Sequence, residues 1–182
     1  MSIFICSDWH LYHDRPFIYE PRGFTNVEEH NSTIIANHNS IVGPEDEVYV
    51  LGDCGFGEDM SRVIELIRQM NGKKHLIIGN HDSDKKINLF KEANIFEDIQ
   101  FGCRFRYKKI EFWLTHYPMD MGNYEDPKPV WNIHGHTHSK EKINERNYNV
   151  SPEAHNCYPI SLDNIYKEIK EKKYEAYLST PQ

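Results

Sequence analysis

The sequence has no hydrophobic run long enough to cross a membrane and no stretch dominated by one or two residue types. Its longest apolar segments, around Ile3–Cys6 and His75–Ile78, have the length of a strand, whereas a membrane-spanning helix needs about 20 apolar residues. The 10 glycines and 9 prolines do not cluster into a linker. We therefore expect a single folded domain over residues 1–182, with no membrane segment.

Cysteine is scarce, and its four residues lie far apart without forming a Cys-x-x-Cys pair. This spacing argues against a zinc clip or a dithiol redox motif. We expect reduced thiols, with Cys6 and Cys54 packing as small apolar side chains. The N-terminus enters an apolar segment without a basic leader or a cleavage signal. These features predict a cytoplasmic location.

Positive charge is also in short supply, because 21 Lys and Arg residues stand against 28 Asp and Glu residues and give a net charge of -7. Such a chain is poorly suited to wrapping extended nucleic acid, since that mode of binding depends on neutralising many phosphates. A small phosphorylated substrate is compatible with this charge. Histidine, by contrast, is abundant with 11 residues, and the positions of these residues are more informative than their number.

The first half of the sequence alternates predicted strands with predicted helices. The strands are predicted over 2–7, 47–51 and 74–79, and the helices over 26–42 and 59–70. Asn26 is a helix cap with Glu29 three residues further on, which is typical of a helix start. Alternation of this kind predicts parallel strands with helices packed outside them, and a ligand site at the carboxyl ends of the strands.

The second half is richer in predicted strands. We predict a hairpin over 104–108 and 110–115, a core strand over 130–134 and extended structure over 140–150. After Ser161, apolar residues recur at helical spacing and indicate an amphipathic packing helix at the end of the chain.

Side chains that bind metals follow five of these strands. Asp8 and His10 are two residues apart, so in extended backbone they would project to the same side. Each motif alone has an ordinary explanation as a cap, a turn or a core histidine. Together, at strand ends that gather in one place, they predict a metal site. The predicted ligands are Asp8, His10, Asp53, Asn80, His116, His136 and His138.

Taken in order, the motifs Asp-x-His, Gly-Asp, Gly-Asn-His-Asp, a lone His and Gly-His-x-His resemble those of the calcineurin-like metallophosphoesterase superfamily. The match spans residues 8–138, and the segments 149–151 and 158–162 are similar to the tail of small bacterial and phage members. The resemblance implies an α/β fold in which two mixed β-sheets pack face to face. Helices would flank the sheets in a four-layer sandwich, with the metals at one edge.

The resemblance also implies two divalent ions that share Asp53. One would be held by Asp8, His10, Asp53 and His138, and the other by Asp53, Asn80, His116 and His136. Mixed imidazole and oxygen ligands suit Mn²⁺, Fe, Zn²⁺, Co²⁺ or Ni²⁺ better than Ca²⁺ or Mg²⁺, and Mn²⁺ is our first choice. The implied reaction is hydrolysis of a phosphodiester or a phosphomonoester by in-line attack of a metal-bridging hydroxide. Among substrates, the resemblance favours small diesters such as nucleotide derivatives.

Other residues are candidates for contacts with the substrate. In the family, the histidine at the position of His81 assists at the phosphate, either by protonating the leaving oxygen or by stabilising the transition state, and Asp82 would orient it. His13 falls where small members carry a further histidine and is a candidate for substrate contact, with an ordinary loop role as the alternative. Arg15 and Arg22 are candidates for gripping a phosphate with two hydrogen bonds, with surface positions as the alternative.

A competing hypothesis is a non-catalytic scaffold of the same fold, as in the retromer subunit that resembles it. Such members lose ligands or the catalytic histidine, whereas every one of these residues is present here. The loops Leu11–Thr25, Gly55–Glu58 and Tyr117–Pro129 are expected to shape the substrate pocket. Small members often self-associate, so the resemblance is also compatible with a homo-oligomer.

Overall fold

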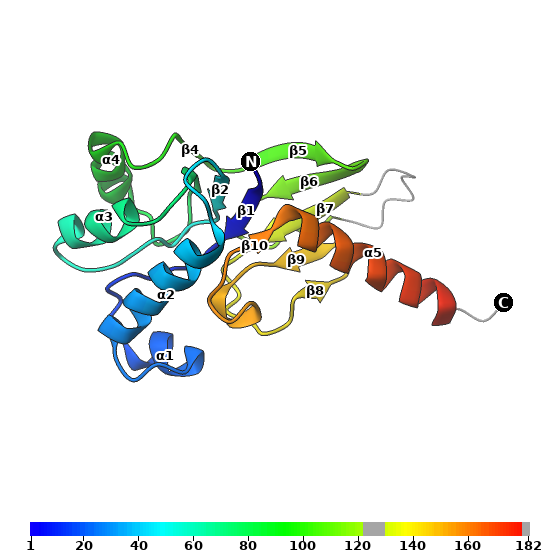
Figure 1. Ribbon diagram of the computed structural model, residues 1–182, viewed down its shortest axis with the longest axis horizontal. Coiled ribbons are helices and arrows are strands. Elements are labelled where there is room, and N and C mark those ends of the chain that lie inside the picture. The colour runs from blue at the N-terminus through cyan, green and yellow to red at the C-terminus, as the bar shows by residue number, and fades with distance from the viewer. Residues whose placement is uncertain (122–129, 180–182) are drawn as a thin grey trace.

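The computed structural model describes residues 1–121 and 130–179, and two sheets form its centre (Figure 1). The first sheet has the strand order β10-β1-β2-β3-β4. Strands β1 to β4 run parallel to one another, and β10 lies antiparallel to β1 at the edge. The predicted parallel strands are therefore confirmed. The bounds are β1 Ile3–Cys6, β2 Glu47–Val50, β3 Lys73–Ile77, β4 Asp98–Gln100 and β10 Ile160–Ser161.

The second sheet has the order β5-β6-β7-β9-β8 and is also mixed. The predicted hairpin is the antiparallel pair of β5 and β6, whereas β6, β7 and β9 run parallel and β8 returns antiparallel to β9. The bounds are β5 Cys103–Tyr107, β6 Ile110–Leu114, β7 Val130–His134, β8 Ile143–Asn144 and β9 Asn147–Asn149.

Successive side chains of the first sheet enter two different apolar clusters. Cys6 and Val50 pack in the cluster that contains the helices on one face of the sheet. Their neighbours Ile5 and Leu51 pack in the cluster that contains the second sheet. This follows from the two-residue repeat of a strand, which sends alternate side chains to opposite faces. The sheets are thus layered, with helices flanking them, and the predicted fold class is confirmed.

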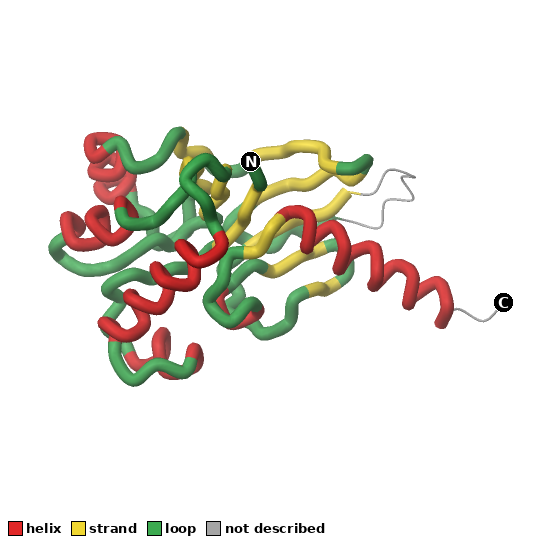
Figure 2. The backbone as a smooth tube through the Cα atoms, in the orientation of Figure 1, coloured by secondary structure: helices red, strands yellow, loops and turns green. Residues whose placement is uncertain are grey.

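Helices α2, α3 and α4 pack beside the first sheet, whereas α5 lies along the strands of the second (Figure 2). The apolar stripe of α5 joins the cluster between the sheets through Leu162, Ile165 and Ile169. No described helix is both long and apolar enough to cross a membrane. The bounds are α2 Val27–Ile41, α3 Met60–Arg68, α4 Asp84–Ala93 and α5 Leu162–Ser179.

Capping explains where two of the three predicted helices begin. The side chain of Asn26 accepts a hydrogen bond from the backbone N–H of Glu29 at 2.8 Å, as predicted for α2. Asp59 accepts one from the backbone N–H of Ser61 at 3.0 Å and caps α3. Several elements that are shorter or less apolar than the predicted ones were not found from the sequence. These are α1 (Pro16–Tyr19), α4, β4, β10 and the 3-10 helices η1 (Glu20–Arg22) and η2 (Pro152–Ala154).

Candidate metal centre

The seven predicted ligands come together where strands of the two sheets end. A hydrogen bond from the backbone N–H of His136 to Asp8 Oδ2, 2.8 Å long, joins the loop after β7 to the loop after β1. Another links the ring of His116, after β6, to the carbonyl oxygen of Leu51 at 2.8 Å. The ends of the two sheets are therefore fixed to each other by the same residues that were predicted as ligands.

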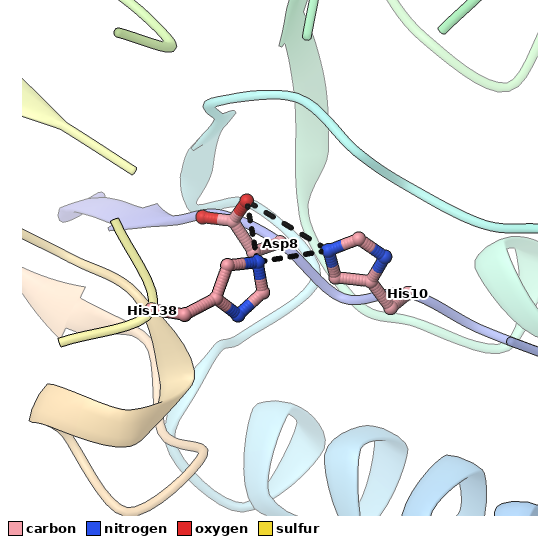
Figure 3. Close-up of side chains that lie close together, drawn as sticks. All are labelled: Asp8, His10 and His138. Carbon is pink, nitrogen blue, oxygen red and sulfur yellow. Dashed lines mark hydrogen bonds and ion pairs between the residues drawn. The ribbon is translucent and has the colours of Figure 1, made fainter. Parts of the chain in front are cut away.

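One group of candidate ligands consists of Asp8, His10 and His138 (Figure 3). The Nε2 atoms of the two histidines lie 3.1 Å apart, and Asp8 Oδ1 lies 3.7 Å from that of His138 and 4.0 Å from that of His10. Asp8 Oδ1 is buried and has no hydrogen-bond partner among the described residues. Because a buried carboxylate oxygen is costly without a partner, a cation at this point fits the donor set.

A second group consists of Asp8, Asp53 and His116. Asp53 Oδ2 lies 3.6 Å from His116 Nε2 and 3.8 Å from His10 Nε2, so one carboxylate oxygen lies near ligands of both groups. Nearby, Asn80 Oδ1 is 2.7 Å from His116 Nε2. The two groups of candidate ligands are therefore adjacent, and the carboxylate of Asp53 lies between their histidines.

His136 lies beside this second group, with its Nδ1 3.2 Å from His116 Nε2. Burial and the neighbouring His116 lower the pKa of His136. Burial, followed by the charge of Arg22, also lowers the pKa of His10. Both rings are therefore neutral at physiological pH, and the neutral imidazole is the form that binds metals.

Hydrogen bonds on the far nitrogens orient two of the rings. His116 Nδ1 bonds to the Leu51 carbonyl, and His138 Nδ1 lies 3.0 Å from Glu153 Oε1. A ring that donates from Nδ1 presents the lone pair of Nε2 to the centre. Burial lowers the pKa of His138, but the hydrogen bond to Glu153 and the charge of Asp8 raise it overall. For the carboxyl group of Asp8, burial has the opposite effect and raises the pKa.

The backbone around the centre is unusual. Of the twelve described non-glycine residues with positive φ, five are candidate ligands: Asp8, His10, Asp53, His136 and His138. We expected extended backbone at Asp8 and His10, but their φ values are 50° and 48°. Both residues take the left-handed conformation, and their side chains still lie in the same group of candidate ligands. Such strain persists only where the surrounding structure imposes it, and it clusters at functional sites.

The structure corrects the predicted role of Asp82. Its Oδ2 accepts hydrogen bonds from the backbone N–H groups of Asp53 at 2.8 Å and Gly79 at 2.9 Å, and its Oδ1 accepts one from Cys54 at 3.2 Å. Among the described residues, no hydrogen bond joins its carboxylate to the His81 ring. Asp82 is buried, so its charge is best satisfied by these backbone donors. These contacts fix the backbone of Asp53 and do not include the His81 ring that Asp82 was predicted to orient.

His81 lies at the rim of the centre. Its Nε2 is 4.0 Å from Asp53 Oδ2, and its side chain is 47% exposed. Its backbone N–H donates to Asp53 Oδ1 at 2.9 Å, which ties the rim residue to the shared carboxylate. A ring in this position can reach a group bound at the centre while remaining open to solvent.

Three residues were predicted to contact substrate, and they have different environments. His13 is partly buried beside the centre, with its Nδ1 3.2 Å from His10 Nδ1. Arg15 is exposed in the same loop, and its charge contributes to lowering the pKa of His13 after the larger effects of burial and His81, so its contact with a phosphate stays a prediction.

The structure does not fit the predicted grip of Arg22 on a phosphate. Its guanidinium is 0% exposed and already bonded within the protein. Its Nε donates to Glu153 at 2.8 Å, and one Nη2 hydrogen bond reaches the Asp8 carbonyl at 3.0 Å. Its Nη1 also lies 2.8 Å from His30 Nε2. A phosphate has no access to these donors, so Arg22 supports the loop of Asp8 instead of gripping substrate.

Glu153 was not found from the sequence. It lies in η2, 15 residues after His138, and no spacing rule connects the two residues. Burial raises the pKa of Glu153, but the hydrogen bond from His138 and the charge of Arg22 outweigh it and lower this pKa to about 2. The carboxylate is therefore charged at neutral pH, which is the form that accepts a hydrogen bond from His138.

Known proteins are similar to this chain in sequence and in fold. A family model described as calcineurin-like phosphoesterase matches residues 1–178. An uncharacterized protein of Methanocaldococcus jannaschii is 35% identical over 183 residues, covering 94% of this chain and 93% of that protein. The gene 66 protein of Mycobacterium phage L5 is 31% identical over 192 residues, covering 88% of this chain and 90% of that protein.

Among solved structures, a protein of unknown function from Aquifex aeolicus is similar, with a TM-score of 0.71 and 26% identity. The likeness covers 91% of this chain and 98% of that one. The family match over nearly the whole chain agrees with the resemblance that the motifs had indicated, and the chain belongs to the calcineurin-like phosphoesterase family.

Proposed function

We propose that this protein is a dinuclear metal-dependent phosphoesterase that hydrolyses small phosphodiesters. The observation that carries the proposal is the position of Asp53 Oδ2, which lies 3.8 Å from His10 Nε2 and 3.6 Å from His116 Nε2. One buried carboxylate between two sets of imidazole ligands is what a shared bridge requires. Mn²⁺ is the ion we expect in both sites, with Fe, Zn²⁺, Co²⁺ and Ni²⁺ as alternatives suited to the same ligands.

When bound, two such cations would activate a water molecule and neutralise charge on the phosphate during in-line attack. The chain's own residues hold this arrangement in place. Asp82 fixes the Asp53 backbone, and the hydrogen bond to Leu51 fixes the ring of His116. His81, exposed at the rim, is the residue we assign to proton donation at the leaving oxygen or to stabilising charge on the phosphate.

A non-catalytic scaffold is the competing function, but it is less well supported. A scaffold has no need for the buried, unpaired Asp8 Oδ1 or for His81 held beside the bridging carboxylate.

The described cysteines are all free thiols, which agrees with the cytoplasmic location that we propose.

The test is hydrolysis of bis(p-nitrophenyl) phosphate and p-nitrophenyl phosphate with Mn²⁺, with the metal content counted by mass spectrometry. We expect faster hydrolysis of the diester and activity that is lost when the metal is removed. His81→Ala should retain two metal ions and lose about 10²–10⁴-fold in kcat, the usual contribution of a general acid. Asp53→Asn should lose both activity and bound metal.

His75→Gln is the matched histidine control, because His75 lies in β3 and pairs with Glu47 and Asp98 away from the ligand cluster. It should leave activity unchanged. A wild-type protein that binds two metal ions and hydrolyses neither ester would contradict the enzymatic proposal and favour the scaffold. A protein that binds no metal would contradict the ligand assignment.

A further inference from the structure

A cleft of about 630 Å³ opens beside the candidate metal centre. This volume lies within the range of about 300–1,000 Å³ that is typical of small-molecule sites. Two of the loops predicted to shape the pocket, Leu11–Thr25 and Gly55–Glu58, contribute to its wall. The third, Tyr117–Pro129, lies mostly outside the described residues. Side chains that line the cleft include His10, His81 and His138 from the centre and Phe17, Ile18 and Phe56 from the loops.

Aromatic rings form a continuous surface from the metal centre to the outside of this cleft. The Phe56 ring is stacked on His10, with centroids 5.2 Å apart, and on His13, with centroids 3.8 Å apart. Phe17 then meets His13 edge-on at 5.7 Å. Phe17 is 68% exposed, so its ring has a free surface beside the cleft. Exposed rings in such a position favour a flat ligand, because offset stacking needs a planar partner.

The cleft offers little to a second negative charge. Among the described residues that line it, there is no lysine or arginine. Lys86 lies 4.2 Å from the centroid of Phe56, but its ammonium group donates to the carbonyls of Gly55 and His81 at 2.7 and 2.9 Å. The acidic side chain in the described lining, Glu153, is bonded to Arg22. The cleft therefore suits an uncharged group attached to a phosphate that is bound at the centre.

We propose that this cleft binds a planar, uncharged ring of the substrate, such as a nucleobase or another aromatic group, and that Phe17 determines this preference. The preferred substrates are then phosphodiesters that carry an aromatic or nucleoside group, rather than diesters of small aliphatic alcohols. This inference rests on the proposed function, since the phosphate must be bound at the centre while the ring occupies the cleft.

The test compares the binding of phenyl phosphate and methyl phosphate to the Mn²⁺-loaded protein by isothermal titration calorimetry. The two monoesters share the phosphate and differ in the esterified group, a phenyl ring in one and a methyl group in the other, and binding needs no turnover. We expect phenyl phosphate to bind the wild-type protein about tenfold more tightly, which is the scale of one stacking contact. Phe17→Ala should reduce this ratio to about one without changing the affinity for methyl phosphate, and Phe17→Trp should retain it.

Phe101→Ala is the matched control, because Phe101 is 84% exposed and does not line the cleft. It should leave the ratio unchanged. Equal affinities in the wild-type protein, or a preference for the ring that survives Phe17→Ala, would overturn the inference. Hydrolysis of the diester without any ring preference would support the proposed function and contradict ring binding in the cleft. A ring preference without hydrolysis would support ring binding and contradict the proposed function.

Discussion

Glu153 Oε1 lies 3.0 Å from Nδ1 of His138, a candidate metal ligand. The same oxygen accepts a hydrogen bond from Arg22 Nε at 2.8 Å, and Arg22 in turn bonds to the carbonyl of Asp8. A charged pair with 0% and 5% side-chain exposure thus fixes the ring of one candidate ligand and the backbone of another. A carboxylate on the far nitrogen of a ligating histidine sets both its tautomer and its orientation.

Replacing Glu153 by Gln should weaken metal binding. The amide keeps the side chain's size, but it removes the negative charge that holds His138 and that balances the buried guanidinium of Arg22. Loss of such an outer partner typically lowers metal affinity by about 10–100-fold. The measurement is Mn²⁺ titration by calorimetry, performed on protein shown to be folded by circular dichroism.

The matched control for this change is Glu65→Gln, since the Glu65 side chain is 65% exposed in a surface pair with Arg68. Its Mn²⁺ affinity should equal that of the wild type. Glu153→Asp, which keeps the charge on a shorter side chain, should recover part of the affinity. If Glu153→Gln bound Mn²⁺ as tightly as the wild type, the carboxylate would have no part in positioning His138.

Asp82→Asn tests whether Asp82 acts on Asp53 or on His81. The amide introduced by this substitution would place an NH₂ group against one of the backbone N–H donors from which the carboxylate now accepts a hydrogen bond. Leaving buried donors unsatisfied costs about 1–3 kcal/mol, so the free energy of unfolding in urea should fall by that amount. Metal affinity should fall with it. A fall in kcat with unchanged stability and metal binding would instead restore the direct role on His81.

Gly135→Ala should disrupt the centre without changing any ligand. A methyl group at Gly135 would contact Asp8 Oδ2 and come within 2.5 Å of Ser7 Oγ, both in a buried environment. Overpacking of this kind costs about 1–3 kcal/mol, and here the displaced atom belongs to a candidate ligand. We expect a lower melting temperature and reduced metal content in the purified protein.

Gly43→Ala is the control for this substitution, because its methyl group would meet Asp46 Oδ2 at the looser distance of 3.3 Å. It should leave metal content unchanged. Normal metal content in Gly135→Ala would mean that the loop can shift away from Asp8, and that the close approach is not needed to form the centre.

The convergence of the candidate ligands could be predicted because each follows a strand whose buried, alternating residues are easy to identify. Parallel strands bring their carboxyl ends to one edge, so Asp8, Asp53 and Asn80 had to lie near one another. The left-handed backbone at Asp8 and His10 could not be predicted in this way, because tertiary contacts impose it.

Roles that depend on a distant partner were the ones that sequence reasoning missed. Arg22 was expected either to grip a phosphate or to lie on the surface, and it does neither, because its partner Glu153 is 131 residues away. The sequence also identified the loops that contain Phe17 and Phe56, but not which of their side chains face the centre. Side-chain direction in a loop follows from packing, which a local pattern does not encode.

A last prediction concerns stability and lies outside the centre. His75 Nδ1 and Nε2 each lie 2.6 Å from a carboxylate oxygen, of Asp98 on β4 and of Glu47 on β2. Burial lowers the pKa of His75, but the hydrogen bonds to Glu47 and Asp98 raise it by more, so the folded pKa is above its usual value. The stability that this contributes is fully present below the unfolded pKa of about 6.5 and is lost as the pH rises through the folded value.

The wild-type protein should therefore melt at a higher temperature than His75→Gln near pH 6, with the difference closing at alkaline pH. The groups are partly exposed, so the contribution is that of a surface pair, about 0.2–1 kcal/mol, or at most about 2–4 °C in melting temperature. Melting curves of both proteins from pH 5 to pH 9 measure it, and added salt should narrow the gap. A difference that is constant over this range would mean that His75 contributes through its stacking on Tyr49, with centroids 4.7 Å apart, and not through its charge.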